Sequence, residues 1–192
     1  MSVVRIDGVD YHTEEDGVTH INVYSGGKTS LGRFWSNFHH SNTMTPHGLF
    51  SSLEGYYHYL KVLRSVIEAK KSVEQLGIHY QLEKLKSVYG KAAQQAGREL
   101  RKHLASLGIY TLDVPDEWFN ANFKEALVNK LNDDKQMQVE VFDNQLPYLH
   151  YYVMGKNVFY KEHFSWLTEQ INSVIEDTEY LIHAGTRKSR AD

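Results

Sequence analysis

Residues 51–68 read SSLEGYYHYLKVLRSVIE, and their apolar side chains recur every three or four residues. That spacing places one apolar stripe on a helix running from about Ser52 to about Lys71. The stripe consists of Leu53, Tyr57, Leu60, Leu63 and Ile67. We therefore expect a central helix here, with Leu53, Leu60 and Ile67 buried.

Further helices are expected toward the C-terminus, because the same period continues. The first two carry Ile78, Leu82, Leu85 and Val88 before an end at Gly90, and Ala92, Ala96, Leu100, Leu104 and Leu107 before a left-handed cap at Gly108. The others are a helix from Asp116 to about Asn132, a short one beginning within 139–142, and a long final helix after Pro147 that contains Phe159, Trp166, Ile171 and Ile175.

The N-terminal side alternates with a period of two, which indicates strands. The expected strands are residues 3–6, 9–12 and 18–24, joined by Asp-Gly steps typical of antiparallel hairpins, with a short extended piece over 32–38 before a turn at Pro46. The sequence thus predicts a helix-rich α+β fold, with its strands concentrated in residues 1–40. We expect one domain over residues 1–185, followed by a polar tail over 186–192.

Composition excludes several classes of protein. The 192 residues are 41% hydrophobic and 23% charged, with 21 basic and 24 acidic side chains and no cysteine. Disulfide scaffolds, thiolate zinc sites and cysteine nucleophiles are therefore excluded. A formal charge of -3 gives no global attraction to nucleic acid. Because no signal peptide and no run of ~20 apolar residues is recognisable, we expect a cytoplasmic protein without membrane contact.

The histidines do not predict a metal centre. His39, His40 and His47 lie close together in the sequence, but their spacing matches no metal-binding motif. We expect neither a metal nor a cofactor.

Glu54 has two interpretations. Ser51 and Glu54 have the spacing of a capping box, in which both side chains bond backbone amides at the start of a helix. Glu54, His58 and Lys61 also share one helical face, crowded by tyrosines, and such surroundings are typical of carboxylates with altered acidity. Spacing alone leaves both interpretations open.

Two stretches together resemble the paired signature of the NADAR family. They are Gly32-Arg33-Phe34-Trp35-Ser36-Asn37-Phe38 and Ser51-Ser52-Leu53-Glu54-Gly55-Tyr56-Tyr57-His58-Tyr59-Leu60-Lys61, laid against G-x-F-S-N-F and P-[ST]-x-E-H-Y-[FY]-x-x-x-K. Residues 20–25, 96–98 and 118–131 are similar to further elements of that family, so the resemblance covers most of residues 20–132.

The resemblance implies an enzyme that cleaves N-glycosidic bonds. Its substrate would be an ADP-ribosylated base, free or carried on nucleic acid, or a ribosylamino-pyrimidine nucleotide. By position Glu54 would be the catalytic residue. The residues expected to bind substrate are Arg33, Ser36, Asn37, Phe38, Tyr57, Lys61, Lys156 and Asn157.

The sequence departs from the family pattern at two places. Gly55 stands where the family has histidine, and residues 152–157 lack the tryptophan and aspartate of the family's C-terminal segment. A catalytically degenerate member that binds a nucleotide or a macromolecule is therefore an alternative, and a helical interaction domain is another. If a second carboxylate takes part, Glu140 and Asp143 are the candidates.

Overall fold

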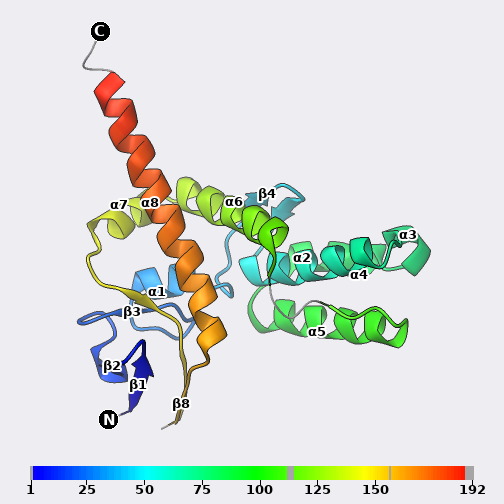
Figure 1. Cartoon of the computed structure of the whole chain (residues 1–192), viewed down its shortest axis with the longest axis horizontal. Helices are drawn as coiled ribbons and strands as arrows, with labels where there is room; N and C mark the ends of the chain where they lie inside the picture. The colour runs from blue at the N-terminus through cyan, green and yellow to red at the C-terminus, as the bar shows by residue number, and fades with distance from the viewer. Residues whose placement is uncertain (1, 112–114, 156, 189–192) are drawn as a thin grey trace. The chain divides into compact units, whose positions relative to one another are not determined.

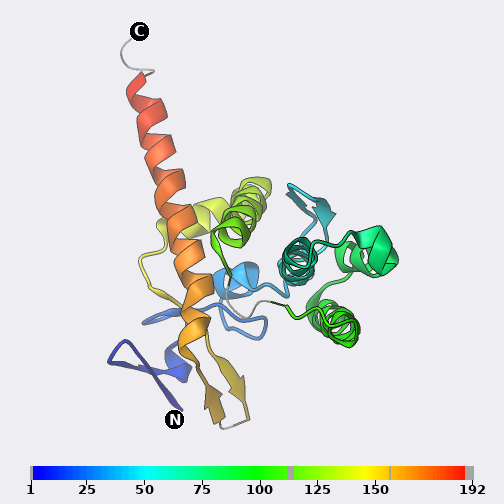
Figure 2. The same cartoon turned by 45° about the vertical axis from the view of Figure 1, so that its right-hand side comes forward.

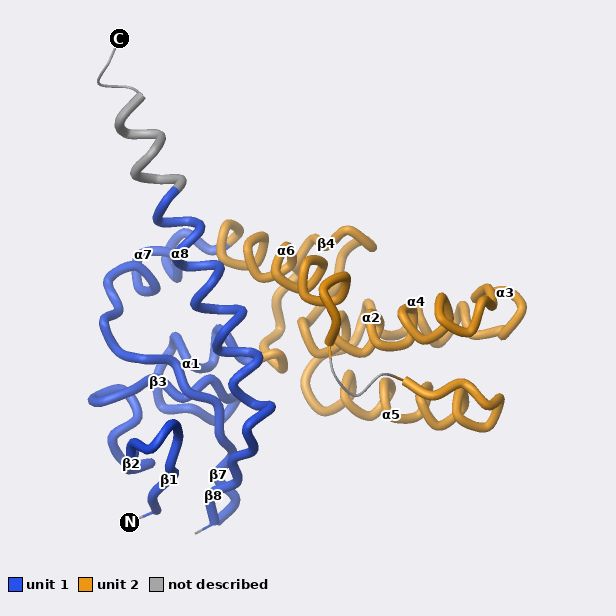
Figure 3. The backbone as a smooth tube through the Cα atoms, viewed as in Figure 1, with its two compact units in different colours: residues 1–36, 134–192 blue, residues 37–133 orange. Residues whose placement is uncertain are grey.

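The computed structural model describes residues 2–111, 115–155 and 157–188 (Figure 1). It is a helix-rich α+β structure, which confirms the predicted fold class. The chain divides into two compact units, residues 1–36 with 134–192 and residues 37–133 (Figure 3). We call them unit 1 and unit 2. One domain over residues 1–185 stays a prediction.

Unit 2 is a helical bundle with one small hairpin. Its elements are β4 (Thr43–Thr45), β5 (Gly48–Phe50), α2 (Leu53–Glu68), α3 (Val73–Leu76), α4 (His79–Ser87), α5 (Gly90–Ser106) and α6 (Glu117–Asp133). Strands β4 and β5 pair antiparallel. Helix α2 packs against α4, α5 and α6, so it is central as predicted. Figure 2 views α2 and α5 nearly end-on.

The buried face of α2 differs from the predicted stripe. Leu53 and Leu60 are fully buried, but Ile67 is 51% exposed. Tyr56, Val62 and Val66 are buried instead, because helices cover α2 on more than one side. One apolar cluster joins α2, α4 and α5 through Val62, Val66, Ile78, Leu82, Leu85, Ala96, Leu100, Leu104 and Ile109.

Unit 1 combines the two ends of the chain. Its regular elements are β1 (Val3–Ile6), β2 (Val9–His12), β3 (Ile21–Asn22), α1 (Ser30–Trp35), α7 (Lys135–Asp143), β6 (Tyr148–Leu149), β7 (Tyr152–Met154), β8 (Asn157–Phe159) and α8 (Ser165–Lys188), with 3-10 turns at Thr13–Glu15 and Glu162–Phe164. The β1–β2 hairpin turns at Asp7-Gly8, both with positive φ, as the Asp-Gly step predicts. A second hairpin joins β7 and β8.

Several sequence predictions about unit 1 are wrong. The third strand, predicted over residues 18–24, covers Ile21–Asn22 and pairs in parallel with β6. This partner is too far along the chain for a local sequence pattern to reveal it. Residues 30–35 form a helix instead of an extended piece, because the Thr29 side chain accepts a hydrogen bond from the Gly32 amide and caps it.

Other helices and strands also differ from their predicted boundaries. Strands occur at 43–50 and 148–159 and are not confined to residues 1–40. Phe159 lies in β8, before the final helix begins at Ser165. Gly90 opens α5 with a positive φ where the sequence predicted the end of the preceding helix. In the expected tail, residues 186–188 continue α8, and 189–192 lie outside the described residues.

Candidate functional site

Helix α2 is capped by Ser52 and not by Glu54. The N-cap is Ser52, whose hydroxyl accepts a hydrogen bond from the Gly55 amide at 3.1 Å and donates one to the Val88 carbonyl at 3.0 Å. With Ser52 as N-cap, the third helical position is Gly55, which has no side chain to reach back. The predicted capping box of Ser51 and Glu54 is therefore wrong.

Glu54 instead pairs with a histidine one turn later. Its side chain is buried, with the residue 8% exposed, and Oε1 lies 3.1 Å from Nε2 of His58. His58 is itself only 3% exposed. The Glu54 amide donates to the carbonyl of Asn37 at 2.8 Å, which ties the start of α2 to the segment before it. The backbone of Glu54 is thus fixed, and its carboxylate has a buried imidazole as a partner.

Lys61 completes the polar face predicted from the sequence. It is 7% exposed, and its Nζ lies 5.5 Å from the centre of the Tyr57 ring, within the range of a cation–π contact. Tyr57 in turn makes edge contacts with Phe119 and Phe123 of α6. An acid, an imidazole and an ammonium therefore lie along one helix beside an aromatic wall.

Two glycines allow neighbouring helices to approach this face closely. A Cβ atom on Gly97 of α5 would lie 2.1 Å from Cγ of His58, so the imidazole packs directly on the α5 backbone. A Cβ on Gly55 would lie 2.2 Å from the carbonyl oxygen of Leu85 in α4. Each glycine is needed because no side chain fits in the contact.

Part of the predicted set belongs to one unit. Asn37 and Phe38 belong to unit 2 with Glu54, Tyr57 and Lys61. The side-chain oxygen of Asn37 is buried and has no hydrogen-bond partner among the described residues, so it is an acceptor that a ligand could use.

Other predicted residues belong to unit 1. The Arg33 guanidinium donates to the carbonyls of Gly27 at 2.9 Å and Lys28 at 2.8 Å. Ser36 caps the end of α1, and Asn157 lies exposed in β8. Lys156 lies outside the described residues. Substrate binding by these four stays a prediction.

The candidate second carboxylates also lie in unit 1, on α7. Glu140 accepts hydrogen bonds from the Ser30 hydroxyl at 2.5 Å and the Gln136 amide at 3.5 Å, and Asp143 is exposed. Both side chains have the surroundings of ordinary surface carboxylates.

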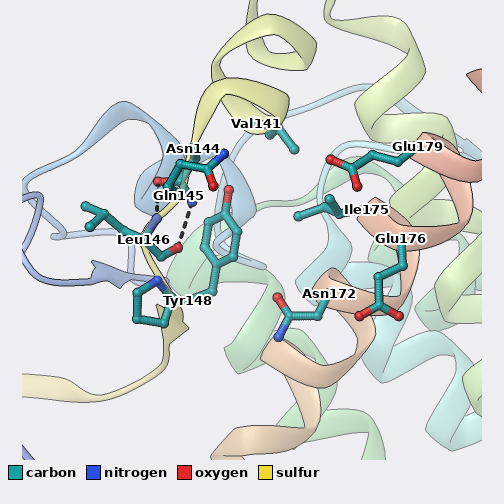
Figure 4. A pocket seen from close by; sticks show the side chains of 10 residues that line it. Val141, Asn144, Gln145, Leu146, Tyr148, Asn172, Ile175, Glu176 and Glu179 are labelled. Carbon is teal, nitrogen blue, oxygen red and sulfur yellow. Dashed lines mark hydrogen bonds between the residues drawn. The ribbon is translucent and has the colours of Figure 1, made fainter. Parts of the chain in front are cut away.

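A pocket of about 360 Å³ occurs in unit 1, and none of the predicted site residues is among those that line it (Figure 4). Its polar lining residues are Asn144, Gln145 and Tyr148 on one side and Asn172, Glu176 and Glu179 of α8 on the other. Asn144 is engaged with the backbone of Leu146 through two hydrogen bonds. The acids here are exposed, in contrast to Glu54.

For the site in unit 2, the sequence did not reveal the close approaches at Gly55 and Gly97 or the burial of Lys130. A glycine inside a helical pattern signals a close approach, so Gly55 and Gly97 could have been found by that rule. Lys130 had no such signal, because lysine near a helix end is usually solvated. It is 2% exposed, and burial lowers its pKa to about 7.

Comparison with known proteins gives no relative: no protein-family model, no curated protein and no solved structure matches the chain. In the described residues, no histidine, aspartate or glutamate side chains gather in a group of three or more that could hold a metal ion. Nor does any helix in the described part have the length and apolar character needed to span a membrane.

Proposed function

We propose that this protein is an N-glycosyl hydrolase of the NADAR type with Glu54 as its catalytic carboxylate. The substrate is an ADP-ribosylated base or a ribosylamino-pyrimidine nucleotide. The observation that carries the proposal is the burial of Glu54: within the described residues of unit 2 it is the one buried carboxylate. A carboxylate is costly to bury, and this one is paired with a buried imidazole.

The chemistry of the bond suits this arrangement. In hydrolysis the bond between ribose C1′ and the base nitrogen breaks, and its electron pair leaves with the base. The sugar then resembles an oxocarbenium ion, which a nearby negative charge stabilises. Water adds to C1′ and gives one proton to Glu54, which passes it to the departing base, so the carboxylate is regenerated. Glu54 can thus act through its charge and as the base for water.

Neighbouring groups are suited to hold a nucleotide. Tyr57 offers an aromatic surface for a base or ribose, and Lys61 supplies a cation for a phosphate. The unpartnered oxygen of Asn37 can accept from a ribose hydroxyl or a base N–H.

The test uses Glu54→Gln, which preserves size but removes the charge. Wild-type protein and variant are incubated with a panel of ADP-ribosylated bases and ribosylamino-pyrimidines, and products are read by mass spectrometry. We expect turnover to fall at least ~100-fold while binding of the same substrate changes little. The matched control is Glu68→Gln, at the exposed end of the same helix, which should keep turnover.

Two results would contradict the proposal. If the wild-type protein binds one member of the panel and converts none, the degenerate binder is correct. If Glu54→Gln retains turnover, the catalytic carboxylate lies elsewhere, and Glu140→Gln and Asp143→Asn become the variants to measure.

A further inference from the structure

The buried imidazole of His58 has an incomplete set of partners. Nε2 lies 3.1 Å from Glu54 Oε1, but Nδ1 is buried without a hydrogen-bond partner in the described part of the chain. A histidine kept only for packing is expected to have both nitrogens satisfied or to be replaced by an apolar residue, because an unpaired buried nitrogen is costly. The Glu54 contact is thus the polar interaction that this imidazole makes here.

We infer that His58 is the positioning residue for Glu54, and that Gly97 fixes His58 in place. An ionised carboxylate can only accept hydrogen bonds, so Nε2 carries the proton and donates to Oε1. This bond restrains a glutamate side chain that otherwise has three rotatable bonds. The oxygen that this bond engages is Oε1. The inference rests on the proposed function of Glu54.

The contact with α5 explains why the imidazole itself is rigid. The position of a Cβ on Gly97 lies 2.1 Å from Cγ, 2.3 Å from Cδ2 and 2.6 Å from Nδ1 of His58. The ring therefore lies directly against the α5 backbone and cannot move further toward it. Because His58 follows Glu54 by one helical turn, both side chains stand on the same face of α2. The carboxylate is thus held between its own helix and a ring fixed by a second helix.

The test separates orientation from binding. His58→Phe keeps a ring of similar size but removes the donor, whereas His58→Gln keeps a donor. With a substrate that the wild-type protein cleaves, we expect His58→Phe to lower kcat by roughly 10- to 100-fold while KM changes by less than about 3-fold. His58→Gln should recover part of kcat. Combined with Glu54→Gln, His58→Phe should cause little additional loss, because both changes disable one unit.

A second apolar variant, His58→Met, guards against a folding defect in His58→Phe, and thermal unfolding is measured for all variants. If a folded apolar variant keeps wild-type kcat while Glu54→Gln is inactive, the inference about His58 is overturned and the proposed function stands. If His58→Gln is no better than the apolar variants, the donor is not what matters and the inference is also overturned. If the wild-type protein converts no substrate, both proposals fail together.

Discussion

The backbone of Gly55 in α2 lies against the carbonyl oxygen of Leu85 in α4, so closely that an added Cβ would be 2.2 Å from that oxygen. The histidine that the NADAR motif carries at this position could not be accommodated without separating the two helices. The imidazole beside Glu54 comes from His58, one turn further along.

Gly55→Ala should destabilise the protein by about 1–3 kcal/mol, because the methyl group overpacks the α2–α4 contact. The direction of the change in stability tests the contact, because replacing glycine by alanine inside an unobstructed helix usually stabilises it by up to about 1 kcal/mol. Urea unfolding followed by circular dichroism measures the difference. A more stable variant would show that α4 does not approach Gly55.

The cap of α2 gives a second prediction. Ser52→Ala should lower the free energy of unfolding by about 1–2 kcal/mol, because it removes the acceptor for the Gly55 amide and the donor to Val88. Ser51→Ala is the matched control and should cost less than about 0.5 kcal/mol. A larger loss of stability in Ser51→Ala than in Ser52→Ala would instead support the capping box of Ser51 and Glu54.

Gly97→Ala tests the contact with His58. The new methyl group would overlap the imidazole, so we expect the ring to move, kcat to fall and the protein to lose about 1–3 kcal/mol of stability. Ala92→Ser, on the exposed side of the same helix, should affect neither quantity. Unchanged kcat in a folded Gly97→Ala protein would argue against a fixed imidazole.

Period and turn residues were enough to predict α2, α4, α5 and α6 of unit 2 and the β1–β2 hairpin, but not the short α3. They failed for Ile21–Asn22, because its partner Tyr148–Leu149 is distant in the sequence. They also failed at residues 30–35, where a local cap by Thr29 starts a helix in place of the expected extended piece. For the site, spacing predicted the shared face of Glu54, His58 and Lys61. Spacing could not show which serine caps α2, because Ser51 and Ser52 are adjacent. The cap is Ser52, whose hydroxyl also bonds the distant Val88 carbonyl.

The burial of Lys130 leads us to expect that the stability of the protein depends on pH. Burial lowers its pKa to about 7 in the folded protein, whereas the unfolded chain has the usual value of about 10.4. Between these values the unfolded chain holds a proton that the folded protein lacks. The Lys130 contribution therefore makes unfolding less favourable as the pH rises from 7 toward 10.

Lys130→Met should remove that slope and stabilise the protein at pH 7, by on the order of one to a few kcal/mol. Urea unfolding at pH 7, 8 and 9 measures it. Lys124→Met, a partly exposed lysine on the same helix, is the control and should keep the slope. An unchanged slope in Lys130→Met would assign the pH dependence to other groups.

The parallel pairing of β3 with β6 has a consequence for the order of events during synthesis. Residues 21–22 leave the ribosome long before residues 148–149 exist, and all of residues 37–133 are made in between. The helices of unit 2 make contacts within one continuous segment and can form as soon as that segment has emerged. Strand β3 has no partner until β6 has been made. For part of translation its edge is therefore unpaired and accessible to chaperones or neighbouring chains.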